Sequence, residues 1–180
     1  MRCVGILVMV LTSTACHDDE EARLLFTTSS LYTGDLGGIA GADAKCAQSA
    51  STAGLDGTFV ALLSDATTNA IDRVGDVGPW NLTNGQLAFR TQADLATVPA
   101  TALGINENGL VVGPPTCAWT GSKAGGKAAP ELCMNWTLGT NDMVGKTGNT
   151  NTIDNRWIEG INDCGNKICS VAQHLYCIEQ

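Results

Sequence analysis

Cysteine is the residue type with the most chemistry to offer in this chain, which has eight cysteines. Six of them lie in the main part of the chain: Cys46, Cys117, Cys133, Cys164, Cys169 and Cys177. In an exported protein such a set favours three disulfide bonds, although the sequence alone does not fix which pairs form. Zinc binding is the competing interpretation, but the spacings contain no Cys-x-x-Cys pair of the kind that zinc sites use. The cysteines therefore predict a disulfide-bonded, exported domain.

Two further motifs point toward nucleotide binding or catalysis, and neither is complete. Residues 121–127 fit the Gly-x-x-x-x-Gly-Lys part of a phosphate-binding loop, but Ala128 stands where Ser or Thr should bind magnesium. Ser170 lies close to His174, yet a catalytic serine, histidine and carboxylate must meet in space, which this spacing does not establish. We therefore expect a flexible Gly and Lys loop, a surface or strand-edge histidine, and no enzymatic activity.

The N-terminus has the pattern of an export signal that ends at a lipid-modified cysteine. The apolar run from Val4 to Leu11 is too short to span a bilayer as a helix, and Ala15 offers a small-residue cleavage site before Cys16. Cleavage there removes Cys3 and leaves an odd number of cysteines, so Cys16 is the natural one without a disulfide partner. Ordinary signal peptidase could also cleave at this point, because a serine replaces the leucine usual three residues before a lipidated cysteine.

The expected organisation is a signal peptide of lipoprotein type at residues 1–15, an acidic tether at 16–23, and one domain at 24–180. Removing Arg2 leaves nine Lys and Arg side chains against 18 Asp and Glu side chains, a formal charge of −9. Nucleic acid repels so acidic a chain, because proteins bind its phosphates through Lys and Arg. The sequence has no second apolar span, so any membrane attachment is through acyl chains. We expect an exported protein that is anchored to the outer membrane by lipid.

Periodicity and turn residues predict the elements of the domain. The expected elements are strands at 23–28 and 58–64, helices at 39–53 and 66–73, and a hairpin at 80–87. Asn84-Gly85 is a strong signal for the turn of that hairpin. Residues 113–155 are rich in Gly, Asn, Thr and Lys, and we expect a long loop region there.

Several blocks of the sequence resemble one known family. They are residues 26–46 and 59–65, Gly78-Pro79-Trp80, Ala118-Trp119-Thr120-Gly121, and the ending in which Cys177 follows Cys169 by eight residues within an apolar strand. They resemble a bacterial lipoprotein domain family of unassigned function, which has a C-type-lectin-like, endostatin-like fold and includes the leptospiral endostatin-like surface proteins. The resemblance runs from about residue 24 to residue 180. It implies an α+β domain with two helices, short antiparallel sheets and a long loop region, stapled by disulfides.

The resemblance also implies the disulfide pairs. Cys46, in the first helix, would join Cys177 in the last strand, and Cys133 would join Cys169 across the loop region. Cys117 and Cys164 would then pair with each other.

In function, the resemblance implies a surface-exposed or periplasmic lipoprotein that binds an extracellular protein or polymer without catalysis. The leptospiral relatives imply host proteins as ligands, such as complement regulators, plasminogen or matrix components. Two alternatives stay open. One is a calcium-dependent carbohydrate-binding lectin, and the other is a structural envelope protein with no soluble ligand.

The candidate binding residues lie in the loops between residues 113 and 163. Four basic side chains could form a cluster that attracts anionic partners: Lys123, Lys127, Lys146 and Arg156. The alternative is that these charges only keep a long loop soluble. Trp119 and Trp136 could offer aromatic platforms to sugar rings, but in a Gly-rich domain core packing is favoured for both.

Calcium is the cofactor to weigh, because many lectin-like domains bind sugars through it. Asn162-Asp163 is similar to the Trp-Asn-Asp motif of those lectins, with Ile161 in place of the tryptophan. Glu159 and Asp142 could add oxygen ligands, which suit a hard cation. However, the companion Glu-Pro-Asn motif is absent from the sequence, and Asn and Asp are also ordinary turn residues. We therefore expect no cofactor, with calcium as the alternative.

Overall fold

The computed structural model describes residues 22–180. The predicted signal peptide, Cys16 and most of the acidic tether lie outside the described residues. Over residues 22–180, no helix has both the length and the apolar character needed to cross a membrane.

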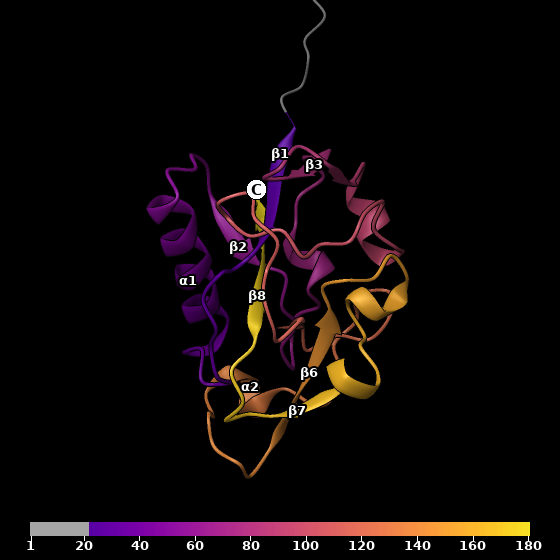
Figure 1. Cartoon of the computed structure of the whole chain (residues 1–180). Helices are drawn as coiled ribbons and strands as arrows, with labels where there is room; N and C mark the ends of the chain where they lie inside the picture. Colours follow the sequence, from indigo (N-terminus) through magenta and orange to yellow (C-terminus); the bar gives the residue numbers. More distant parts are fainter. Residues whose placement is uncertain (1–21) are drawn as a thin grey trace, which may run out of the picture.

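The described chain folds into a mixed α+β domain (Figure 1). Its strands are β1 (Arg23–Thr27), β2 (Phe59–Ala61), β3 (Trp80–Leu82), β4 (Leu87–Phe89), β5 (Cys117–Trp119), β6 (Val144–Asn149), β7 (Asn166–Ile168) and β8 (His174–Glu179). Its helices are α1 (Gly38–Thr52) and α2 (Cys133–Trp136). Short 3-10 turns are η1 (Ile71–Arg73), η2 (Gln92–Ala96), η3 (Asn155–Trp157) and η4 (Asn162–Cys164).

The strands form one mixed sheet and not the antiparallel sheets that we expected. The order is β4-β3-β1-β8-β5-β6-β7, and β2 also pairs with β8. The β1–β3 and β5–β8 pairs are parallel, and the remaining pairs are antiparallel. Parallel neighbours need a long crossover, and α1 with β2 supplies it between β1 and β3.

Strand β8 lies at the centre of the domain, and the core forms on both of its faces. Tyr176 and Ile178 belong to one buried cluster, while Leu175 and Cys177 belong to the other. This alternation follows from the two-residue period of a strand. Because both faces are covered, five of the six residues of β8 are buried, and the four residues from Leu175 to Ile178 are apolar.

Helix α1 covers one face of the sheet, along the left side of Figure 1. Its buried residues Ala42, Cys46, Ser49 and Ala50 follow helical spacing and form one narrow face of small side chains. A disulfide from Cys46 to Cys177 fixes this face to β8.

Three disulfides staple the domain, and they join Cys46 to Cys177, Cys117 to Cys164 and Cys133 to Cys169. These are the pairs that the resemblance implied. Their Cα atoms lie 5.3 to 5.6 Å apart, within the range that a disulfide spans.

The structure corrects the expected helix at residues 66–73. Only Ile71–Arg73 forms a 3-10 turn there. The Asp65 carboxylate accepts the backbone N–H groups of Thr67 and Thr68, both at 2.8 Å. The Asp65 N–H also donates to the Thr68 carbonyl at 3.0 Å, which is opposite to the direction of a helical hydrogen bond, so the chain turns here. Burial acts to raise the pKa of Asp65, but the bonds from Thr67 and Thr68 outweigh it and hold the pKa below its ordinary value.

The expected long loop region is also more structured than its composition suggests. Residues 113–155 contribute β5, β6 and α2 to the domain, and they bury Trp119 and Trp136 completely. Two disulfides attach this region to the rest of the core through Cys117 and Cys133.

Candidate functional site

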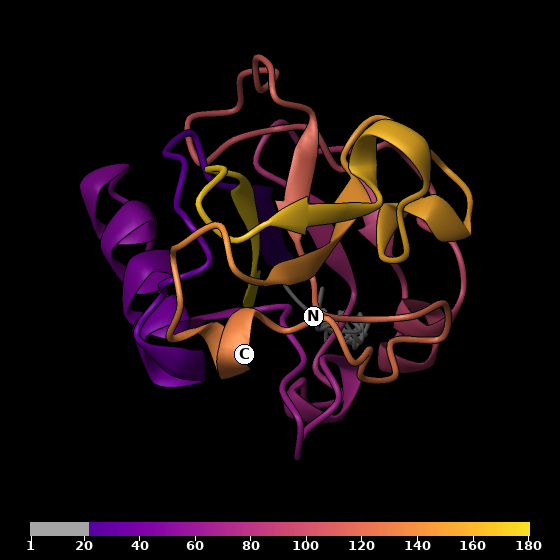
Figure 2. The ribbon, with the colours of Figure 1, turned by 90° about the horizontal axis from the view of Figure 1, so that it is seen from below.

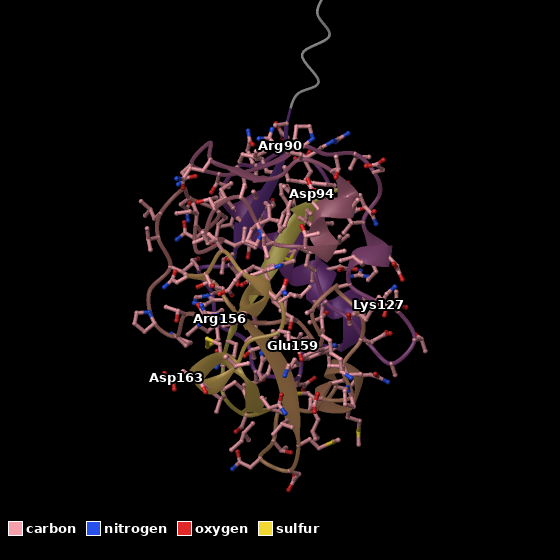
Figure 3. All side chains as sticks on the ribbon, turned by 90° about the vertical axis from the view of Figure 1, so that its right-hand side faces the viewer. Arg90, Asp94, Lys127, Arg156, Glu159 and Asp163 are labelled. Atoms are coloured by element: carbon pink, nitrogen blue, oxygen red, sulfur yellow. A yellow bond between two sulfur atoms is a disulfide. The ribbon has the colours of Figure 1, made fainter. Side chains whose placement is uncertain are left out.

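Three of the four side chains of the predicted basic cluster form ion pairs with carboxylates. Lys127 lies 3.9 Å from Asp72, Lys146 lies 3.8 Å from Glu159, and Arg156 lies 2.6 Å from Asp154, measured between charged atoms. Of these four residues, Lys123 alone has no ion pair within residues 22–180. Figure 3 shows Lys127 and Arg156 interspersed with Glu159 and Asp163 on one side of the molecule. The local positive field that the sequence suggested is therefore largely neutralised.

The pair of Arg156 with Asp154 is the tightest of these contacts. The Arg156 guanidinium donates to both carboxylate oxygens, and its backbone N–H also donates to Asp154. The hydrogen bond from the Arg156 side chain is the main reason that the pKa of Asp154 lies far below its ordinary value. The same bond raises the pKa of Arg156. Asp154 caps the turn η3, so the pair has a local structural role.

The segment with a partial phosphate-loop pattern is a tight hairpin. The Lys123 N–H donates to the Lys127 carbonyl at 2.7 Å, and the Gly126 N–H donates back to Lys123 at 3.0 Å. Gly126 has a φ of +69° and packs against Ile71. A hairpin uses these backbone N–H groups internally, so they do not converge on a phosphate.

The candidate calcium ligands are not gathered around one point. Asn162 and Asp163 border a small cavity of about 170 Å³ together with Arg156, whose positive charge opposes a cation. The Glu159 carboxylate instead accepts the Ala124 N–H at 2.8 Å and pairs with Lys146. Asp142 accepts the hydroxyl of Thr140. Within residues 22–180, no three or more His, Cys, Asp or Glu side chains come together as a metal site would require.

The tryptophans proposed as sugar platforms are core residues. Trp119 and Trp136 are fully buried, and their rings pack against each other with centroids 5.7 Å apart. The Trp119 indole N–H donates to the Tyr32 carbonyl at 2.8 Å. This is the core packing that the sequence favoured for both residues. A fully buried ring cannot stack on a ligand, so the alternative role as sugar platforms is corrected.

His174 and Ser170 do not form a catalytic pair. His174 is buried, and its ring nitrogens face the carbonyl oxygens of Thr28 at 2.5 Å and Gly113 at 3.4 Å. The Ser170 hydroxyl instead contacts the Asn141 side chain. The histidine connects β8 to two neighbouring segments and has no hydroxyl to activate.

A cavity of about 600 Å³ opens beside the start of β1 and the end of β8. Two of its three charged residues are paired with each other, because Glu179 accepts the Leu24 N–H at 2.8 Å and forms an ion pair with Arg23. The third, Asp56, is exposed and has no hydrogen bond or ion pair within residues 22–180, and a lone exposed carboxylate does not by itself make a binding site.

Exposed apolar side chains gather at the opposite end of the domain. We call Met134, Met143, Val144, Ile168 and Val171 the distal patch; these residues are 36 to 59% exposed. They come from α2, the start of β6, the end of β7 and the turn before β8. These segments lie at the lower end of Figure 1, whereas β1 begins at the upper end. No local sequence pattern indicates the patch, because its members lie far apart along the chain.

Backbone pairing brings the members of the patch together. Val144 and Ile168 are direct partners across β6 and β7, and the Cys169 N–H donates to the Met143 carbonyl at 3.0 Å. The Val171 N–H donates to the Ile168 carbonyl at 2.9 Å. Met134 follows Cys133, whose disulfide to Cys169 attaches α2 to the same end of β7.

Helix α2 presents Met134 through an unusual backbone. All four residues from Cys133 to Trp136 have positive φ, between 46° and 66°. A left-handed turn of residues with side chains costs roughly 1 to 2 kcal/mol per residue, so other contacts must hold it. The Trp136 indole N–H donates to the Ser64 carbonyl at 2.7 Å, and the Asn135 side chain accepts the Ala66 N–H at 3.0 Å. Met134 is left 59% exposed.

The fold and this surface define a disulfide-stapled α+β domain with an apolar patch at one end. The chain belongs to the family described as "Protein of unknown function (DUF1554)", whose sequence model matches residues 29–153. The match includes the three patch residues from α2 and β6 and ends before β7. No curated protein matches this chain.

Proposed function

We propose that this chain is a non-catalytic lipoprotein of the bacterial envelope that binds an extracellular protein through the distal patch. Cys16 would carry the lipid, and the outer membrane would be the site of anchoring, with the domain on the cell surface or in the periplasm. A C-type-lectin-like, endostatin-like fold is part of the proposal. The disulfides from Cys46 to Cys177 and from Cys133 to Cys169 support it, because the resemblance to that family implied both.

The position of the distal patch carries the proposal. An anchor that precedes Arg23 would attach at the end of the domain opposite the patch, so the patch would face away from the membrane (Figure 1). Exposed apolar side chains that gather at one end of a domain are candidates for a protein interaction surface. Methionine suits such a surface, because its flexible side chain adapts to a partner.

Photo-crosslinking tests the proposed binding surface. A photo-reactive residue in place of Val144 in the full chain, expressed in cells that carry the natural envelope, should capture a specific protein. Changing Met143 and Val144 to Asp should then weaken binding of that protein by about tenfold or more, because charged groups would be buried in the contact. The matched control changes Leu110 and Val111, which are 64% and 73% exposed and lie outside the patch, to Asp. Equal loss in both double variants, or no captured protein, would contradict the proposal.

The lipid anchor has its own test. Cys16→Ser should release the protein from membranes while the domain stays folded, because the three disulfides use other cysteines. A variant that still fractionates with membranes would show that Cys16 is not the attachment point.

A calcium-dependent lectin is the second candidate, supported by the resemblance of Asn162-Asp163 to a lectin motif. A glycan array with calcium and with a chelator separates it from protein binding. Calcium-dependent glycan binding that is lost in Asp163→Asn would favour the lectin. A structural envelope protein would show neither glycan binding nor a captured partner.

A further inference from the structure

Strand β7 is an open edge of the sheet. It pairs with β6 on one side and ends the strand order. The opposite edge, β4, is covered, because the Ala100 N–H donates to the Ala88 carbonyl at 2.9 Å. Figure 2, which views the domain from below, shows β7 at the front with β6 beside it. An exposed edge presents unpaired N–H and carbonyl groups, which are a template for pairing with another chain.

The hydrogen bonds of β6 and β7 show which backbone groups face outward. The Thr147 N–H donates to the Gly165 carbonyl at 3.1 Å, and the Cys169 N–H donates to the Met143 carbonyl at 3.0 Å. In an antiparallel ladder the bonded residues alternate, so Lys167 faces β6 while Asn166 and Ile168 face the other way.

Three of these outward backbone groups have no partner within residues 22–180. They are the N–H and carbonyl of Asn166 and the N–H of Ile168. The Ile168 carbonyl already accepts the Val171 N–H. These two donors and one acceptor lie on exposed residues that are two positions apart. An added strand would form its main-chain hydrogen bonds with groups at this spacing.

We propose that β7 is the edge to which an extended segment of the partner protein adds as a further strand of the sheet. This inference rests on the proposed function and assigns its mode of recognition. Main-chain bonds to Asn166 and Ile168 would hold the segment, while Ile168 and its neighbour Val144, 44% and 36% exposed, would contact an apolar side chain on it. A polysaccharide has no regular row of N–H and carbonyl groups to match this edge.

Lys167 favours a partner segment with an acidic residue over a second copy of β7 that is paired in the register centred on Lys167. If β7 paired with β7 of another copy about a twofold axis centred on Lys167, the two Lys167 side chains would stand opposite each other. That position is a non-hydrogen-bonded pair, in which side chains lie closest and like charges destabilise. An acidic residue on the partner would be favoured at the same place. The segment that fits is therefore extended, with an acidic residue opposite Lys167 and an apolar residue opposite Ile168.

Selection from a displayed library of random decapeptides against the full chain provides the probe. The expected winners are extended sequences with one acidic residue next to an apolar residue. A synthetic copy of a winner should slow hydrogen exchange of the Asn166 and Ile168 amides, measured by nuclear magnetic resonance. A control peptide with the same sequence, in which alternate backbone amides are N-methylated, keeps the side chains but lacks the N–H donors. It should fail to bind.

Ile168→Pro is the matched variant of the protein. It removes only an outward N–H, so it leaves the β6–β7 bonds intact, and thermal unfolding verifies its fold. It should abolish peptide binding, while Ile168→Val should bind as the natural chain does. Lys167→Glu should weaken the acidic peptide by about two- to fivefold and favour a peptide with Lys in place of the acid by a similar factor.

Three outcomes would overturn strand addition: equal binding by the N-methylated peptide, unchanged binding by a folded Ile168→Pro, or a library that yields no peptide sensitive to that variant. The photo-captured protein distinguishes this failure from failure of the proposed function. Loss of its binding with the Met143 and Val144 changes, but not with Ile168→Pro, would refute strand addition alone. Absence of any patch-dependent captured protein would refute the proposed function itself.

Discussion

Trp136 donates its indole N–H to the carbonyl oxygen of Ser64 at 2.7 Å, and it does so from a left-handed backbone with a φ of +66°. Both residues are fully buried. The bond therefore ties a strained turn at the surface to the centre of the domain. Met134, two residues earlier, depends on this attachment for its exposed position.

Replacing Trp136 by Phe tests that attachment. The change removes the donor and leaves the buried Ser64 carbonyl without this partner, which costs about 1 to 3 kcal/mol. The lost ring volume adds to the cost. Denaturant unfolding should show the loss, whereas Val144→Ala at the exposed end of β6 should change stability by less than about 0.5 kcal/mol. Equal stability in Trp136→Phe would mean that the turn is held by other contacts.

Met134→Gly separates backbone strain from side-chain contact. Glycine adopts positive φ without a Cβ penalty, so we expect Met134→Gly to be more stable than Met134→Ala by about 1 kcal/mol. Both variants lose the same exposed side chain and should bind the captured protein equally weakly. Chemical unfolding and binding measured on both variants check the two expectations. A Gly variant less stable than the Ala variant would show that the turn is right-handed in solution.

The elements with strong local signals were predictable from sequence. The helix expected at residues 39–53 is α1 at Gly38–Thr52, and Asn84-Gly85 forms the turn between β3 and β4, with Gly85 at a φ of +85°. In each case short-range preferences and the tertiary structure agree. The first strand, expected at 23–28, is β1 at Arg23–Thr27 for the same reason.

Features that depend on distant contacts were not predictable. Nothing local indicates that β1 runs parallel to β3, or that four residues from Cys133 take left-handed angles. The expected strand at 58–64 is shortened to Phe59–Ala61, because only these residues pair with β8. The distal patch escaped prediction because β6 and β7 meet only in the folded sheet.

The disulfides should contribute to stability in the order of the chain lengths that they close. Sequence separations of 131, 47 and 36 residues correspond in the chain-entropy model to about 5, 4 and 4 kcal/mol. Removing the pair of Cys46 and Cys177 by double Ala substitution should therefore destabilise the domain most. Thermal unfolding of the three double variants checks the order. A larger loss for Cys133 and Cys169 would indicate that the strained turn depends mainly on that bond.

Because Tyr176 is buried, we expect the domain to lose stability at alkaline pH. Burial raises the pKa of its phenol above the ordinary value of 10.0, and its hydroxyl donates to the Trp157 carbonyl at 3.0 Å. The unfolded chain loses the proton near pH 10 and the folded chain keeps it, so the contribution is complete below that pH. Above it, the free energy of unfolding should fall by up to about 1.4 kcal/mol per pH unit. Tyr176→Phe should remove this dependence, whereas Tyr32→Phe should retain it. Denaturant unfolding from about pH 8 to about pH 11, a range that brackets the ordinary pKa of tyrosine, measures the difference.

The basic side chains of the loop region give the last prediction. Changing Lys123, Lys127, Lys146 and Arg156 together to Gln should alter affinity for the captured protein by less than about twofold, because three of the four are paired with carboxylates. Titrations at low and high ionic strength measure the effect, and circular dichroism verifies the fold. If these residues form the site, affinity should instead drop at low salt, and the difference should disappear at high salt, where charges are screened. That result would move the binding surface from the distal patch to the face shown in Figure 3.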